Sequence, residues 1–190
     1  TSTDKTLIPV KSGIVGPKLF KYTHYNNNKL NKQPVLFIPG HKGMVDQVRS
    51  FSSTMHNGDG YFQYFALDFQ EASSAFHGSD VLIQAVFVND ALRQIQTLYE
   101  ISMKQAKIKK DLPQIQIVAH SLGGMVARAS VLLSNHPLPL GLDALKEGDC
   151  GVSDIIMMSS PNHKPPYSPD ASVDVLYTAV NRAWAASLYN

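Results

Sequence analysis

The chain has 190 residues, which fits one domain on a scale of about 150 residues per domain. Its 17 basic residues nearly balance 15 acidic ones, which argues against a partner that is nucleic acid or an anionic membrane surface. Apolar residues make up 44% of the chain, so a folded domain with a sizeable core is expected rather than disorder. Cys150 is the only cysteine, and an internal disulfide is therefore excluded.

Targeting segments are not evident in these residues. No run approaches the roughly 18 consecutive apolar residues of a membrane-spanning helix, and the first residues lack the basic start and apolar stretch of a signal peptide. The chain also begins without methionine. We therefore expect an excised or incomplete piece of a longer protein.

The first elements in chain order are a lead-in, an edge strand and a buried strand. Residues 1–18 mix prolines, glycines and polar residues without a period and predict an irregular lead-in. Residues 18–25 alternate weakly and predict an edge strand, so that residues 1–30 hold a lead-in and one edge strand. Residues 34–38 (PVLFI), closed by Pro39 and Gly40, predict a strand buried on both faces.

Strands and helices then alternate to the end of the chain. Helices are predicted over 44–55, 81–103, 122–134 and 173–189, and strands over 61–69, 114–119 and 153–159. This order predicts a single α/β domain over residues 1–190, with a mostly parallel sheet flanked by helices. The loop over 136–152 is long enough to be a lid or an insertion.

The strongest local motif is IVAHSLGG at residues 117–124, where an apolar strand ends in Ser121 and a helix follows at once. This is the setting of a nucleophile elbow, in which a strained turn projects the serine oxygen above the strand ends. Gly123 and Gly124 supply the small residues that the elbow needs, and Ala119 replaces the first glycine of G-x-S-x-G. The alternative is that Ser121 simply caps the helix that follows.

A second motif, FIPGHKG at residues 37–43, follows the first buried strand. In α/β-hydrolases one oxyanion donor is the amide after the nucleophile, and the other comes from a loop after an earlier strand. The donors here would be the amides of Leu122 and of His41 or Lys42, with Gly40 in the pocket wall. In isolation, an ordinary Pro-Gly turn explains this loop equally well.

The general base is not apparent among the seven histidines. The triad of this fold runs serine, acid, histidine along the chain, and only His136 and His163 follow Ser121. Neither is well placed: His136 follows the helix that leads away from the site, and His163 is expected at the pocket wall. His120 is interpreted as filling space behind the elbow. No metal-ligand or phosphate-loop spacing is present, which leaves a metal hydrolase unsupported.

Taken together, the sequence blocks resemble the lipase-like luminal domain of the GPI inositol-deacylase family. The blocks occur in family order over roughly residues 30–185: PVLFIPGHKGMVDQVRS, ALDFQEASSAFHG, FVNDALRQI, IVAHSLGGMVARA, MSSPNHKPP and LYTAVNRAW. The resemblance implies an enzyme of the endoplasmic reticulum membrane that hydrolyses the acyl ester on the inositol of GPI-anchored proteins. It also implies Ser121 as nucleophile, His41 and Leu122 as oxyanion donors, and no cofactor.

The resemblance also implies that part of the catalytic apparatus is missing from these residues. The family's catalytic Asp and His follow the helix that here contains Asn181 and Trp184, and the chain stops at Asn190. We therefore expect a chain truncated before the last strands, nearly inactive alone, whose membrane segments lie outside it. Pro161-Asn162-His163 departs from the family's Pro-His. The alternatives are a general lipase or thioesterase, and a non-catalytic module that binds lipid or a partner.

Overall fold

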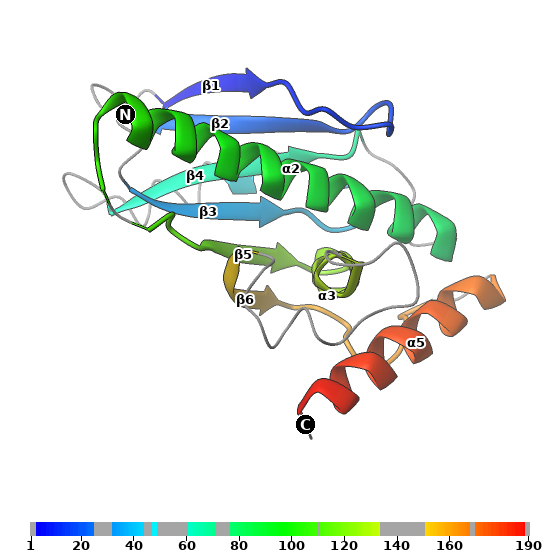
Figure 1. Ribbon diagram of the computed structural model, residues 1–190. Coiled ribbons are helices and arrows are strands. Elements are labelled where there is room, and N and C mark those ends of the chain that lie inside the picture. The colour runs from blue at the N-terminus through cyan, green and yellow to red at the C-terminus, as the bar shows by residue number, and fades with distance from the viewer. Residues whose placement is uncertain are drawn as a thin grey trace.

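The computed structural model describes residues 3–24, 32–43, 47–48, 61–70, 77–109, 111–133, 151–167 and 170–188. The elements in chain order are β1 (Thr3–Ile8), β2 (Lys18–His24), β3 (Gln33–Ile38), β4 (Phe62–Asp68), α2 (Gly78–Gln105), β5 (Ile115–His120), α3 (Gly123–Leu133), β6 (Val152–Met158) and α5 (Ala171–Leu188). The strands form one six-stranded sheet in the order β1-β2-β4-β3-β5-β6 (Figure 1). Strands β4, β3, β5 and β6 are parallel, and β2 is antiparallel to both β1 and β4.

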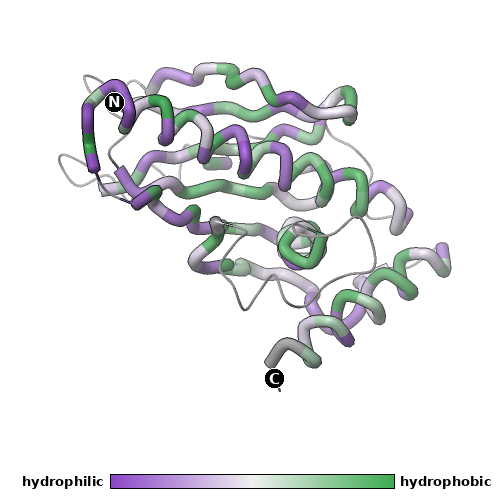
Figure 2. The backbone as a smooth tube through the Cα atoms, viewed as in Figure 1, coloured by the Kyte–Doolittle hydropathy of each residue, from purple (hydrophilic) through white to green (hydrophobic). Residues whose placement is uncertain are grey.

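The centre of the sheet confirms the expected α/β class. Strands β3 and β4 are buried along nearly their whole length, and Figure 2 shows β3 as a continuous apolar segment. Alternate side chains enter two separate cores, because successive residues of a strand point to opposite faces. Leu36 and Ile38 join the core under the helices, whereas Val35 and Phe37 join the core on the opposite face.

The three described helices lie on the same face of the sheet. Helix α2 crosses that face diagonally and packs against α3, and α5 packs against both (Figure 1). Their shared core includes Val88 from α2, Val126 from α3 and Tyr177 from α5. None of the described helices is long and apolar enough to cross a bilayer. The expected helix over 44–55, apart from residues 47–48, and nearly all of the expected 136–152 loop lie outside the described residues.

Strand β1 corrects the expectation of an irregular lead-in. Residues 3–8 pair antiparallel with β2, from Thr3 opposite His24 to Ile8 opposite Leu19, so β1 rather than β2 is the edge strand. Its described side chains are mostly exposed, and Lys5 lies 4.2 Å from the ring centre of Phe20. A strand held mainly by backbone pairing has no buried face, and its sequence therefore shows no hydrophobic alternation.

The first turns of α2 and α5 are joined side by side, although they are far apart in the chain. The N-cap residue of α2, His77, makes no side-chain cap, and the N–H of Gly78 instead donates to Ser172 Oγ at 2.9 Å. Asp170 caps α5 by accepting from the backbone N–H of Ser172 at 3.0 Å and from its hydroxyl at 2.5 Å. His77 Nδ1 lies 3.3 Å from the same carboxylate. Helix α2 therefore receives its cap from α5.

Replacing Asp170 by alanine is expected to destabilise the domain at neutral pH, with a loss that fades in acid. Hydrogen bonds from Ser172, and then from His77, lower the pKa of Asp170 from 3.8 to about 2. Because the folded state holds the charged form more tightly, this stabilisation is present above about pH 4 and is lost as the pH falls towards 2. Urea unfolding of the two proteins across this range measures the difference. Asp111→Ala, in an exposed loop, is the control, and equal unfolding of native protein and Asp170→Ala at neutral pH would contradict the expectation.

Candidate active site

Ser121 occupies the sharp turn between β5 and α3. Its φ is +53°, in the left-handed region that side chains other than glycine rarely adopt. The turn is held by backbone hydrogen bonds: the N–H of Ser121 donates to the carbonyl of Met158 at 2.9 Å, and that of Gly124 donates to the carbonyl of Ser121 at 3.1 Å. Strain in a non-glycine residue persists when the surrounding structure enforces it, and such residues cluster at functional sites. An ordinary helix N-cap has extended backbone instead.

The two glycines after Ser121 allow α3 to begin close to its neighbours. A Cβ atom at Gly123 would lie 2.5 Å from the carbonyl oxygen of Ile38 and 2.6 Å from that of Pro39. A Cβ atom at Gly124 would overlap the side chain of Ser160, which follows β6. Both glycines are buried, whereas Ser121 is partly exposed. The small residues therefore let the elbow fit between β3 and β6, and Ser121 remains accessible.

The loop after β3 touches Ser121 directly. A Cβ atom at Gly40 would lie 2.7 Å from Ser121 Cβ and 3.2 Å from its Oγ. The loop closes as a tight turn, with the N–H of Gly43 donating to the carbonyl of Gly40 at 2.9 Å, and Lys42 has a φ of +50°. The two motifs that the sequence singled out thus meet at the ends of adjacent parallel strands.

Residues beside this contact differ in burial. Leu122 is 5% exposed, while His41 and His120 are partly exposed. Burial, and then the neighbouring charge of Lys42, lower the pKa of His41. His41 therefore favours its neutral form more than an exposed histidine would.

Gly40→Ala is expected to impair the reaction of Ser121. The added methyl group would crowd Ser121 Cβ and Oγ and push the loop away from the nucleophile. We expect a loss of about 100-fold in hydrolytic rate, the scale of losing one oxyanion donor. Steady-state kinetics of the intact protein measures the loss, with Gly13→Ala as the control because nothing lies within 4 Å of a Cβ there. Native rates in Gly40→Ala would show that this loop takes no part in the reaction.

The described histidines do not form a catalytic pair with Ser121. No hydrogen bond among the described residues joins the Ser121 hydroxyl to a histidine, and His77 instead contacts Asp170. His163 is exposed and lines a hollow together with Arg128 and Trp184. His136 lies outside the described residues. The structure thus brings Ser121 and Gly40 together, and the place of His163 in the wall of the ester pocket stays a prediction.

Two parts of this region were missed by the sequence reasoning. Ser159 has a φ of +49° at the end of β6, and the next residue, Ser160, packs on Gly124. The run of small residues after the strand is a weak signal for this close packing. Arg128, within the apolar pattern of α3, is only 8% exposed, and a charged residue on a buried helix is a signal that the sequence does contain.

The fold is that of the α/β-hydrolases. It is similar to a hyperthermophilic esterase from the archaeon Pyrobaculum calidifontis, with a TM-score of 0.54 and 16% identity over 95% of this chain and 54% of that chain. It is also similar to the siderophore hydrolase EstB from Aspergillus fumigatus, with a TM-score of 0.52 and 12% identity over 76% of this chain and 39% of that chain. At these identities the likeness establishes the fold alone.

The family is defined by closer relationships. A family model described as the PGAP1-like alpha/beta domain matches residues 29–190, and the chain belongs to this family. The chain is 34% identical to the GPI inositol-deacylase of Kluyveromyces lactis over 87% of its length, and 33% identical to that of Aspergillus terreus over 85%. It spans 17% and 14% of those relatives.

Proposed function

We propose that the chain is the hydrolase domain of a carboxylic ester hydrolase with Ser121 as its nucleophile. The observation that carries the proposal is the strained, partly exposed Ser121 in contact with the loop at Gly40. A serine that merely capped α3 would have no need of positive φ or of a glycine facing its oxygen. Relatives named as inositol deacylases support the same chemistry.

The proposed reaction is acyl transfer through a covalent intermediate. Ser121 Oγ attacks the ester carbonyl, its proton passes to a general base, and the alcohol leaves to give an acyl-enzyme. Water then attacks the acyl group and releases the carboxylic acid. The backbone amides of Leu122 and His41 are the proposed donors to the oxyanion, since they follow Ser121 and Gly40 at the contact between the two loops. His120, Gly123 and Gly124 support the elbow, and no cofactor takes part.

The general base and its acid are proposed to lie on residues other than those described. No hydrogen bond joins the Ser121 hydroxyl to a histidine among the described residues. A serine without a base is a weak nucleophile at neutral pH, so the 190 residues by themselves are expected to turn over esters very slowly. Efficient hydrolysis by these residues alone would contradict this assignment and point to a histidine within them.

The proposed substrate is the acyl ester on the inositol of GPI-anchored proteins, cleaved at the endoplasmic reticulum membrane. The support is the name shared by the relatives at 33–34% identity. The intact protein should release fatty acid from inositol-acylated GPI in preference to a simple ester of the same acyl chain. Equal rates on both would indicate a general lipase or thioesterase. No reaction of Ser121 with a fluorophosphonate would indicate a binding module without catalysis.

A further inference from the structure

The end of β6 and the residues after it, 158–163, contact the turn at Ser121 and are called the post-β6 segment below. The N–H of Ser121 donates to the carbonyl of Met158 at 2.9 Å. Ser159, next to that acceptor, has a φ of +49°, and Ser121 has a φ of +53°. Two strained residues thus lie at the two ends of one backbone hydrogen bond. Because such strain persists only where surrounding contacts enforce it, the post-β6 segment must itself be held in place.

Two residues of α3 meet the post-β6 segment, and they lie about one helical turn apart. At the start of α3, a Cβ atom on Gly124 would overlap the side chain of Ser160. Four residues later, Arg128 Nη1 donates to the carbonyl of Asn162 at 3.3 Å. Residues four apart lie on the same face of a helix. The absence of a side chain at Gly124 therefore lets the segment approach α3, and Arg128 bonds the segment there.

Arg128 is a buried cation, and its charge is costly to the fold. The residue is 8% exposed, and it forms no ion pair among the described residues. Burial lowers the pKa of Arg128, which reflects the free energy needed to take the charge out of water. A buried charge without an ionic partner is unfavourable, and an apolar side chain at this position would cost less. The guanidinium is therefore better explained by its contact with the post-β6 segment than by the stability of α3.

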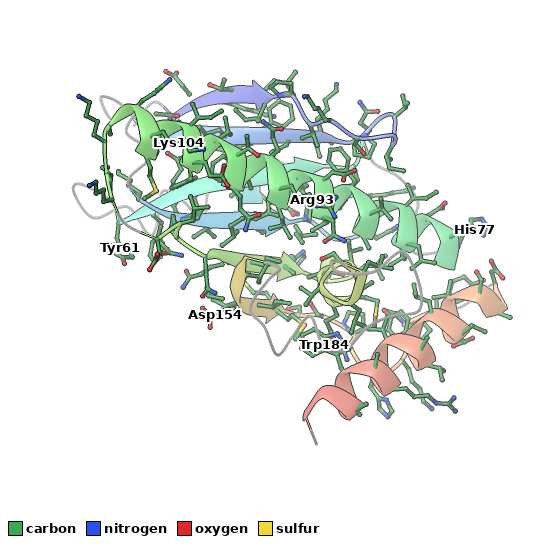
Figure 3. The ribbon with its side chains drawn as sticks, viewed as in Figure 1. Tyr61, His77, Arg93, Lys104, Asp154 and Trp184 are labelled. Atoms are coloured by element: carbon green, nitrogen blue, oxygen red, sulfur yellow. The ribbon has the colours of Figure 1, made fainter. Side chains whose placement is uncertain are left out.

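Helix α5 supports both the guanidinium and the post-β6 segment. Trp184 projects from α5 towards α3 (Figure 3), and its indole N–H donates to the Arg128 carbonyl at 3.2 Å. The guanidinium of Arg128 lies 5.3 Å from the centre of the same ring, which is within the range of a cation–π contact. Asn181 Nδ2 donates to the carbonyl of His163 at 3.1 Å, at the far end of the segment. Arg128 is thus oriented by α5 while it holds the segment.

We propose that Arg128 is a positioning residue for Ser121. By bonding the post-β6 segment to α3, it keeps the Met158 carbonyl on the Ser121 N–H and holds the turn in the conformation that presents the serine hydroxyl. Arg128 comes about two helical turns after Ser121 in the chain, so it acts through the segment rather than on the reacting atoms. Its effect on catalysis rests on the proposed function of Ser121, whereas its effect on the conformation of the turn does not.

The test is Arg128→Met in the intact protein, which removes the guanidinium donors and keeps an unbranched side chain. We expect kcat for inositol-acylated GPI to fall about 10- to 100-fold, the scale of misplacing a reacting group by about 1 Å. KM should stay within about twofold, because the contact serves the transition state rather than substrate binding. Hydrogen exchange of the Ser121 N–H, followed by mass spectrometry, should become about tenfold faster as the turn opens more easily. Arg128→Lys keeps a charged donor and should recover part of both losses.

Tyr99→Phe is the matched control for a general loss of stability. It removes another buried hydrogen bond, from the Tyr99 hydroxyl to the carbonyl of Lys32 at 2.6 Å, at the opposite end of the sheet from Ser121. This variant should keep native kcat and native exchange of the Ser121 N–H.

The proposal requires both changes in Arg128→Met, so native kcat or native exchange there overturns it. A raised KM with native kcat, or an equal fall of kcat in Tyr99→Phe, overturns it as well. If Arg128→Met does not fold, Arg128→Lys is measured in the same way, and native values there overturn the proposal. Native hydrolysis by Ser121→Ala would instead overturn the proposed function, and exchange of the Ser121 N–H would then decide alone whether Arg128 holds the turn.

Discussion

Replacing Ser121 by alanine is expected to lower ester hydrolysis by roughly 10⁴-fold or more and to abolish labelling by a fluorophosphonate, because the nucleophilic oxygen is lost. The measurement is release of fatty acid from inositol-acylated GPI by the intact protein. The fold should be unaffected, since alanine at this position has the same positive φ and the same backbone contacts as serine. Retained activity would exclude the elbow as the reaction centre.

Ser121→Gly provides a second measurement on the same residue. Glycine adopts positive φ without steric conflict, so the Gly variant should be about 1 kcal/mol more stable than the Ala variant, although equally inactive. Ser130→Ala is the matched serine control, because the Ser130 hydroxyl is buried within α3 and donates to the carbonyl of Ala127. It should keep native activity. Equal stability of the Gly and Ala variants would mean that the turn at Ser121 stores no strain.

The parts of the fold that bury apolar side chains are the parts that the sequence predicted well. Residues 34–38 and 114–119 were predicted as strands, and they became β3 and β5 at the centre of the sheet. Their apolar runs are distinctive because both faces of a central parallel strand are buried. The family resemblance, confirmed by the match over residues 29–190, extended that prediction to the α/β-hydrolase fold.

Features that rest on backbone contacts were not predictable in the same way. Strand β1 is held to β2 by backbone pairing, and the first turn of α2 is capped by Ser172 from a distant segment. Neither leaves a periodic pattern in its own stretch of sequence. The same holds for the site. The elbow motif predicted Ser121 as the nucleophile, whereas the contact between Ser121 and Gly40 could be seen only in the folded structure. His163, expected at the pocket wall, lines a hollow together with Arg128, and its role there stays a prediction.

Gly123→Ala is expected to have the largest structural effect of any single methyl group added near the site. The new Cβ atom would lie 2.5 Å from the Ile38 carbonyl oxygen and 2.6 Å from that of Pro39. Both are backbone atoms at the end of a central strand, so neither can move without shifting β3 or the start of α3. Overpacking of a buried site costs about 3 kcal/mol, which corresponds to a fall of about 6–12 °C in Tm for a domain of this size.

The same displacement should reach the reaction, because Gly123 lies between the strand that leads into the Gly40 loop and the helix that follows Ser121. Moving the two apart would separate the proposed oxyanion donors, and removal of one such donor lowers rates by about 100- to 1000-fold. Thermal unfolding and hydrolysis by the same preparation measure both effects. Gly13→Ala adds the same methyl group where nothing lies within 4 Å, and it should change neither Tm nor rate. Native stability in Gly123→Ala would mean that the elbow tolerates a wider separation of β3 and α3. The close approach of α3 to β3 would then not be what holds Ser121 against Gly40.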